Sequence, residues 1–185
     1  MIENSNVCFK IENCTLYNSG DPSFNTGIKL QSVSNGSLIA NNISNCGYGI
    51  ELCYSNNTSI SGNTVNNSYY GIYFEMSDNN TISGNNVGNN FYGIYLRYSN
   101  NSDILGNTAN YNVIYGIYLD YNCVNNNLSG NNARYNDDYG IYLEMSDNNT
   151  ISGNTASNNM GHGIFLYYSD DNTITGNIAN NKYIP

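Results

Sequence analysis

The sequence predicts an all-β fold, a right-handed single-stranded parallel β-helix of about seven to eight coils of 22–24 residues, each with three short strands. Two observations predict it. Glycine followed by isoleucine recurs every 22 to 24 residues, with Leu or Phe two positions after the isoleucine, and asparagine gathers at fixed positions of the same repeat. The glycines are Gly27, Gly49, Gly71, Gly93, Gly116, Gly140 and Gly163. A repeat this short stacks coil on coil and buries its apolar face against its neighbours.

Each coil holds three apolar anchor positions, and each anchor marks one strand. The first strand is the Gly-Ile-x-Leu segment, whose period of two is typical of a strand with one buried face. The second is centred on Leu38, Ile60, Ile82, Ile104, Leu128, Ile151 and Ile174. The third is centred on Ile43, Val65, Val87, Ala109, Ala133, Ala156 and Ile178. Three strands per coil predict a triangular solenoid.

We expect one domain over residues 1–185, with an irregular first coil over 1–26 and regular coils over 27–185. The irregularity is a small loop at Ser19–Thr26. Solenoid ends normally carry polar caps, and no amphipathic helix is predicted at either end. Two explanations stay open: the chain is a slice of a longer solenoid, or its ends stack head to tail on identical copies.

Asparagines of one corner are expected to form a structural ladder. Amide side chains donate and accept along a stack, and asparagine also tolerates the left-handed conformation of tight corners. The ladder residues are Asn41, Asn63, Asn85, Asn107, Asn131, Asn154 and Asn177. A second column is Asn35, Asn57, Asn79, Asn101, Asn125, Asn148 and Asp171.

Composition excludes several classes of function. The net charge is −9 with only five Lys and Arg, which disfavours nucleic acid. No apolar run is long enough to cross a bilayer, and no signal peptide opens the chain. We expect an extracellular or cell-surface segment of a longer exported protein. The five cysteines fall in five different columns, which predicts mostly free thiols.

Tyrosines form two outward columns beside the first strand. Tyr73, Tyr95, Tyr118 and Tyr142 stand between the inward Ile and Leu of successive coils and are candidate glycan-binding residues. The alternative is that these rings stack on one another and stiffen the sheet. The second column precedes the glycine and contains Tyr48, Tyr70, Tyr92, Tyr115, Tyr139 and, in place of tyrosine, His162.

Charged residues form the next outward column. Glu75, Arg97 and Asp120 are expected to pair as a surface ladder. Asp120 and Glu144 on adjacent coils are the best candidates for paired catalytic acids. Asp147 and Asp170 stack at a corner and are a weak candidate for calcium; no other metal and no cofactor is expected. A single histidine excludes a Ser-His-Asp or Cys-His site.

The segment Asn79–Asn85, read as Asn-Asn-Thr-Ile-Ser-Gly-Asn and followed by Gly93-Ile94-Tyr95-Leu96, resembles the repeats of NosD-like proteins. It is also similar to the carbohydrate-binding and sugar-hydrolase β-helix class of archaeal and bacterial surface proteins. The resemblance covers nearly the whole chain and implies the fold. It also suggests copper, but Met76 and Met145 share a column three coils apart and Met160 lies elsewhere, so no soft-metal cluster is expected.

The leading hypothesis is a non-catalytic structural or adhesive module that contacts glycans or neighbouring surface proteins, or assembles end to end. The alternative is a polysaccharide lyase, a glycoside hydrolase or a fragment of one. Irregularities near Val113, Asn122–Asn126 and Asp137 add one or two residues each. Because cleft-forming enzymes need longer loops, the non-catalytic hypothesis is favoured.

Overall fold

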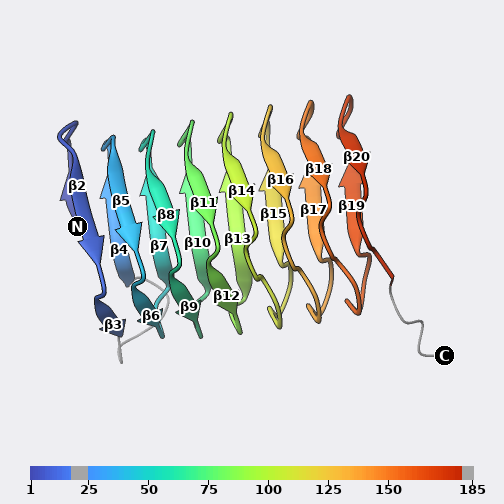
Figure 1. Cartoon of the computed structure of the whole chain (residues 1–185), viewed down its shortest axis with the longest axis horizontal. Helices are drawn as coiled ribbons and strands as arrows, with labels where there is room; N and C mark the ends of the chain where they lie inside the picture. The colour runs from blue at the N-terminus through green and yellow to red at the C-terminus, as the bar shows by residue number, and fades with distance from the viewer. Residues whose placement is uncertain (18–24, 181–185) are drawn as a thin grey trace.

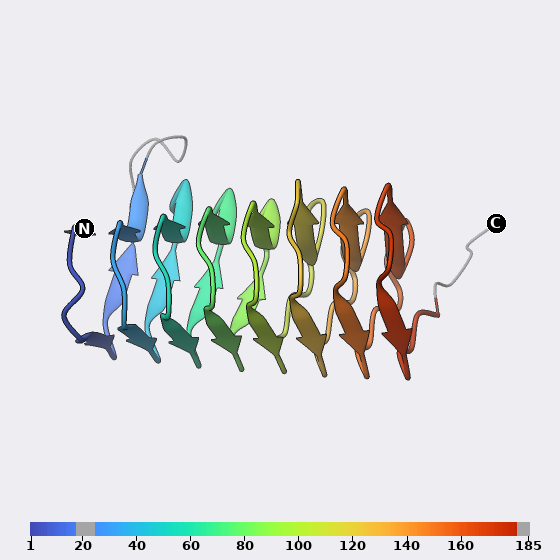
Figure 2. The same cartoon turned by 90° about the horizontal axis from the view of Figure 1, so that it is seen from above.

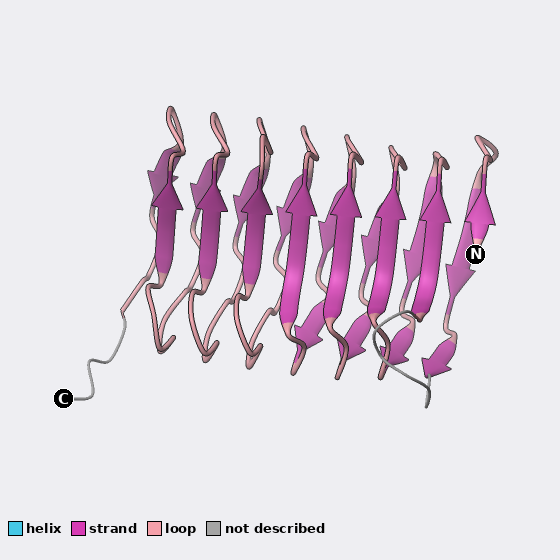
Figure 3. Cartoon of the chain, turned by 180° about the vertical axis from the view of Figure 1, so that it is seen from behind, coloured by secondary structure: helices cyan, strands magenta, loops and turns pink. Residues whose placement is uncertain are grey.

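The computed structural model describes residues 1–17 and 25–180, and this part of the chain consists of strands and loops (Figures 1 and 3). Successive coils lie side by side along one axis in chain order (Figure 1). All strand pairs are parallel and join elements one coil apart. The predicted fold class, an all-β parallel β-helix, is confirmed. Most of the loop expected at 19–26 lies outside the described residues.

Three sheets form the walls of the solenoid, and Figure 2 shows them from above. Sheet A contains β1 (Ile2–Glu3), β4 (Thr26–Gln31), β7 (Tyr48–Cys53), β10 (Tyr70–Glu75), β13 (Tyr92–Arg97), β15 (Ile117–Asp120), β17 (Ile141–Glu144) and β19 (Ile164–Tyr167). Sheet B contains β2 (Phe9–Glu12), β5 (Gly36–Ile39), β8 (Ser59–Ser61), β11 (Thr81–Ser83), β14 (Asp103–Leu105), β16 (Asn127–Ser129), β18 (Thr150–Ser152) and β20 (Thr173–Thr175). Sheet C contains β3 (Thr15–Tyr17), β6 (Asn42–Ser44), β9 (Thr64–Asn66) and β12 (Asn86–Gly88).

The third strand is shorter than predicted in the later coils. After β12 it shrinks to single bridges, such as Thr108 with Asn132. The anchor there changes from the β-branched Val87 to Ala109, which has a lower strand propensity. Our assignment of Ile178 as an anchor is wrong by one residue. Ile178 pairs with the outward Thr155 and is half-exposed. The inward position of this coil therefore belongs to the next residue, Ala179.

The core is a stack of identical apolar positions. Ile72 and Phe74 of β10 and their equivalents in β13 are fully buried. Gly71 is required by close approach, because a Cβ there would lie 2.6 Å from the carbonyl oxygen of Gly93 in the next coil. Small residues at this position therefore let adjacent coils touch.

The predicted asparagine column runs inside the solenoid as a ladder of hydrogen bonds. The backbone N–H of Asn63 donates to Oδ1 of Asn85 at 2.9 Å, and Nδ2 of Asn85 donates to the Ile60 carbonyl at 2.9 Å. The same bonds repeat from Asn41 to Asn177. The left-handed residue of this corner is the preceding one, for example Gly84 with a φ of 59°. The ladder asparagines therefore serve hydrogen bonding and not corner geometry.

Three further interior ladders were not predicted. In each, the backbone N–H of one coil donates to a side-chain oxygen of the next coil, or to the sulfur of Cys123, and their signal in the sequence is a Ser or Asn at a nearly constant distance from the glycine. They contain Ser55, Ser77, Ser99 and Ser146; Asn80, Asn126, Asn149 and Asn172; and Asn90, Asn112, Asn136 and Asn159. None of the five cysteines, all of which lie in the described part of the chain, forms a disulfide, as the column analysis predicts, and Cys46 and Cys123 occupy ladder positions.

Candidate functional site: the aromatic face of sheet A

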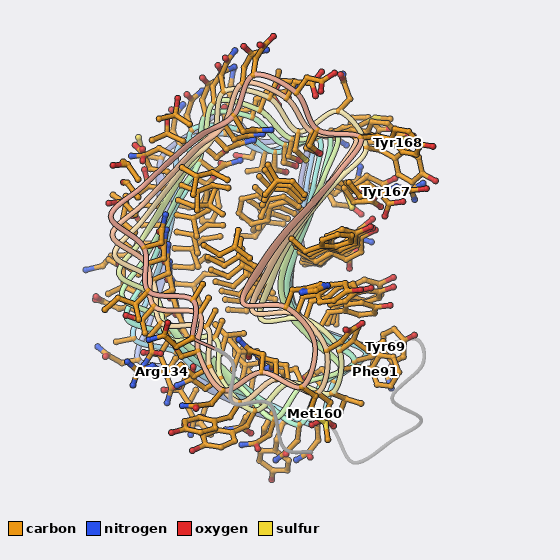
Figure 4. All side chains as sticks on the ribbon, turned by 90° about the vertical axis from the view of Figure 1, so that its right-hand side faces the viewer. Tyr69, Phe91, Arg134, Met160, Tyr167 and Tyr168 are labelled. Atoms are coloured by element: carbon orange, nitrogen blue, oxygen red, sulfur yellow. The ribbon has the colours of Figure 1, made fainter. Side chains whose placement is uncertain are left out.

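Most of the aromatic side chains project from the outer side of sheet A, where the ribbon bends inward (Figure 4). Tyr73, Tyr95, Tyr118 and Tyr142 pair in register on adjacent strands. Their ring centroids are 5.2, 4.7 and 4.9 Å apart in succession. Tyr73, Tyr118 and Tyr142 are only 7–8% exposed. These rings therefore cover each other's faces, and the surface that they leave for a ligand is small.

The second tyrosine column lies directly beside the first. Tyr48 stacks on Tyr70 at 4.8 Å, and Tyr115 on Tyr139 at 5.3 Å. His162 continues the stack at 5.5 Å from Tyr139, so it replaces a tyrosine as the sequence predicts. We call the two columns together the aromatic floor.

Tyrosine hydroxyls of the floor are bonded to the neighbouring acids. Tyr95 donates to Asp120 at 2.5 Å, and Tyr118 donates to Glu144 at 2.6 Å. Burial raises the pKa of Asp120 above its ordinary value, and the hydrogen bonds from Tyr95 and Tyr118 partly oppose that rise. Burial also raises the pKa of Tyr95 and Tyr118, and the acids they contact raise it further. The two candidate acids are thus linked through phenol groups, in register on β15 and β17.

Only half of the predicted ion-pair ladder forms. Arg97 Nε lies 3.8 Å from Asp120 Oδ2, whereas Glu75 accepts a hydrogen bond from Tyr73 at 3.2 Å and forms no ion pair in the described part of the chain. The Arg97 guanidinium lies 5.2 Å from the ring centroids of both Tyr98 and Tyr121. Two rings and a carboxylate therefore surround this cation.

Aromatic and methionine side chains, all of them exposed except the half-buried Tyr98, border the floor on one side, and the sequence analysis missed them. They directly follow the sheet A strands, and we call them the first rim: Tyr54, Met76, Tyr98, Tyr121, Met145 and Tyr168. Each has a φ of 47–50°, a left-handed backbone that bulky residues adopt at a cost of about 1–3 kcal/mol. The signal in the sequence was a Tyr or Met one position after the charged column.

A second rim borders the floor on the opposite side. Tyr69 and Phe91 stack at 4.6 Å, and both are labelled at the lower right of Figure 4, across the floor from Tyr167 and Tyr168. A small cavity of about 250 Å³ opens here between Gly47, Tyr48, Tyr69 and Tyr70. The arrangement is an aromatic strip bordered by two rims, with a pocket beside the second rim.

The metal candidates do not gather into a site. Oδ1 of Asp147 accepts the backbone N–H of Asp170 at 2.7 Å, so this carboxylate caps the next coil. Within residues 1–17 and 25–180, no group of three His, Cys, Asp or Glu could hold a metal ion. Met76 and Met145 lie on different coils of the rim. These residues do not fit a copper centre.

A chain of short parallel coils with interior polar ladders and one aromatic outer face defines a β-solenoid repeat protein. The sequence model of the family described as periplasmic copper-binding protein (NosD) matches residues 1–113 and 52–184. The chain belongs to the NosD family. No curated protein matches the chain in sequence. Among the described residues, no helix is long and apolar enough to span a bilayer.

Solved structures with the same fold include enzymes named for polysaccharides. A mutant of the periplasmic alginate epimerase AlgG is 28% identical over 78% of this chain and 35% of its own, with a TM-score of 0.75. The A-module of the Azotobacter vinelandii mannuronan C-5 epimerase AlgE6 is 16% identical over 98% and 59%, with a TM-score of 0.73. The Dettilon tailspike protein is 18% identical over 91% and 40%, with a TM-score of 0.79. The chain thus spans roughly a third to three fifths of the length of each of these proteins.

Proposed function

We propose that the chain is a non-catalytic, glycan-contacting β-helix module of a protein outside the cytoplasm. The observation that carries the proposal is the first rim, together with the pocket beside Tyr69 and Tyr70. Aromatic rings bury the apolar faces of sugars while the hydroxyls around them hydrogen-bond. The predicted contact residues Tyr73, Tyr95, Tyr118 and Tyr142 then act as the floor that holds the contact residues in place.

Backbone strain supports a functional role for the rim. Corners elsewhere in the same coils place asparagine at positive φ, as at Asn79 and Asn101. Asparagine tolerates this conformation, whereas a tyrosine such as Tyr54 at 55% exposure costs stability and gains little burial. Strained residues of this kind cluster at binding sites. Tyr111 and Tyr135 have the same strained backbone on another corner, so what distinguishes the first rim is its position beside the aromatic floor.

The named activities of the similar structures support the same conclusion. Two of them are epimerases of alginate or mannuronan, and the family description and AlgG are periplasmic. We therefore place this module in the periplasm or outside the cell, as one part of a longer solenoid.

The second candidate function is a carbohydrate-active enzyme that uses Asp120 and Glu144. The observation in its favour is the hydroxyl of Tyr118, which bonds to Glu144 while burial raises the pKa of Asp120. A carboxyl with a raised pKa and a neighbouring carboxylate are the parts of a general acid and base. Against it, Asp120 is only 3% exposed, which hinders direct contact with a substrate.

One incubation with a polysaccharide panel tests both candidates. Retention of a polymer without new chain ends, weakened by Tyr54→Ser and Tyr168→Ser, supports the binding module. New chain ends that are lost in the variant Asp120→Asn with Glu144→Gln would make the chain an enzyme. Tyr135→Ser, an exposed tyrosine of the corner that follows the third strand, is the matched control and should leave retention unchanged.

Head-to-tail contact between copies is a separate proposal. Ile174 and Ile178 of the last described coil are half-exposed, and within residues 1–17 and 25–180 β19 and β20 pair on one side only. Open strand edges of this kind accept another strand, from the same polypeptide or from a second copy. Light scattering across a concentration series decides the matter, because stacking of copies predicts a mass that rises with concentration.

A further inference from the structure

We propose that the aromatic face binds an uncharged, hydroxyl-rich polysaccharide laid along the coil axis, and that it rejects polyuronates such as alginate. This inference rests on the proposed glycan contact and specifies its ligand. It also separates this chain from the epimerases that share its fold.

The charge of the face is the first argument. The sheet A strands carry the acids Glu3, Glu51, Glu75, Asp120 and Glu144 against the bases Lys29 and Arg97. Lys29 Nζ donates to Glu51 at 2.8 Å, and Arg97 lies between two tyrosine rings beside Asp120. Both cations on these strands are therefore already engaged. A polymer with one carboxylate per sugar meets repulsion here and gains no counter-charge.

The hydrogen-bonding character of the face is the second argument. Hydroxyls of Tyr73, Tyr95 and Tyr118 donate to neighbouring carboxylates of the same face and are therefore not free to donate to a ligand. The partly exposed Glu75 and Glu144 present carboxylate oxygens, which accept hydrogen bonds, to the outside. Sugar hydroxyls supply the matching donors, whereas an ionised uronate carboxylate accepts only. The aromatic face therefore favours ligands that donate hydrogen bonds.

Spacing is the third argument. Each of the six coils from β7 to β19 contributes one first-rim side chain, and coils repeat every ~4.8 Å, close to the length of one pyranose in an extended chain. Successive sugars can therefore meet equivalent residues, from Tyr54 at one end to Tyr168 at the other. The pocket between Tyr48, Tyr69 and Tyr70 lies across the floor, where a branch or a chain end can enter.

Cation bridging does not provide an alternative route for polyuronates. Calcium could link two sets of carboxylates, but it needs a cluster of oxygen ligands from the protein. The described residues offer no group of three acids, His or Cys that could hold such an ion. Selectivity should therefore persist when calcium is added or chelated.

The experiment compares soluble neutral glucans, mannans and galactans with alginate and with chitosan, at low and at high salt. We expect at least one neutral polymer to be retained at least tenfold more strongly than alginate at low salt. Added salt should narrow the difference, because it screens the repulsion without touching the sugar stacking.

Charge variants sharpen the result. Glu75→Gln with Glu144→Gln keeps the oxygens that accept from the tyrosines and removes two charges, so the preference for neutral polymer over alginate should fall at least threefold. Glu12→Gln with Asp103→Asn removes the same charge from exposed positions of sheet B and should leave that preference unchanged.

The outcomes separate the two proposals. Retention of no polymer at all would overturn both the glycan contact and its specificity. Equal retention of alginate and neutral polymers at low salt would overturn the specificity and leave glycan contact standing. Retention of chitosan alone, lost at high salt, would indicate unspecific attraction of a polycation to an acidic protein and would also overturn the inference.

Discussion

Replacement of Asn85 by alanine tests the interior ladder most directly. Asn85 is buried, and its side chain makes four hydrogen bonds: Oδ1 accepts from the backbone N–H and from Nδ2 of Asn63, and Nδ2 donates to the Ile60 carbonyl and to Oδ1 of Asn107. Each such bond contributes about 1 kcal/mol net, and each buried group left without a partner costs about 1–3 kcal/mol. The expected loss is therefore about 3–6 kcal/mol, a large share of the stability of a typical domain.

Urea denaturation followed by far-UV circular dichroism measures this loss, with Asn86→Ala as the control. Asn86 is adjacent and exposed, so its replacement should cost less than about 0.5 kcal/mol. Asn177→Ala, in the last described coil, should lie between the two because Asn177 is only partly buried. If Asn85→Ala and Asn86→Ala unfold at the same urea concentration, the ladder does not stabilise the fold and the reasoning fails.

The remaining predictions concern the rim, the floor and the coil contacts. Met76→Asn should keep or raise the melting temperature, by relief of up to about 1–3 kcal/mol of strain, and should weaken polymer retention; loss of stability would contradict the strain argument. Burial raises the pKa of Tyr70 and Tyr115 to about 12 in the folded state, against about 10 when unfolded. The unfolded chain therefore loses these protons first, and the free energy of unfolding should fall as pH rises from about 10 to about 12; a flat profile in urea melts would contradict this. Gly93→Ala should cost at least about 3 kcal/mol, because its Cβ would meet the backbone of Gly116, whereas Gly84→Ala has open space and should cost about 1 kcal/mol in paired thermal melts.

Much of the fold follows from the sequence because every coil repeats the same pattern of glycine, buried apolar residues and asparagine. The spacing of Gly71 and Gly93 identifies coils, and the alternation around Ile72 identifies buried strands. The prediction was weaker where a residue has two roles. Asparagine both hydrogen-bonds along a stack and accepts positive φ, and only the structure separates Asn85, which does the first, from Asn79, which does the second.

The candidate site was harder to predict than the fold. Outward tyrosines such as Tyr118 are evident from the period of two, but their burial depends on rings of two columns meeting side by side. The first rim escaped notice because Tyr98 and Tyr121 lie outside the strands, at positions that usually hold a small turn residue. Their left-handed backbone cannot be read from residue type.

The interior ladders also give the molecule a direction. In every ladder the backbone N–H of one coil donates to a side-chain acceptor of the following coil, which is an oxygen at every step except the sulfur of Cys123, and one ladder runs in this way from Asn41 to Asn177. A coil that has just left the ribosome therefore has open donors until its successor arrives. Folding can then proceed from the N-terminus during synthesis, because each new coil supplies the hydrogen-bond acceptors that the coil before it needs. The two ends of the stack are chemically different for the same reason, so any joining of coils across a boundary has a single permitted orientation.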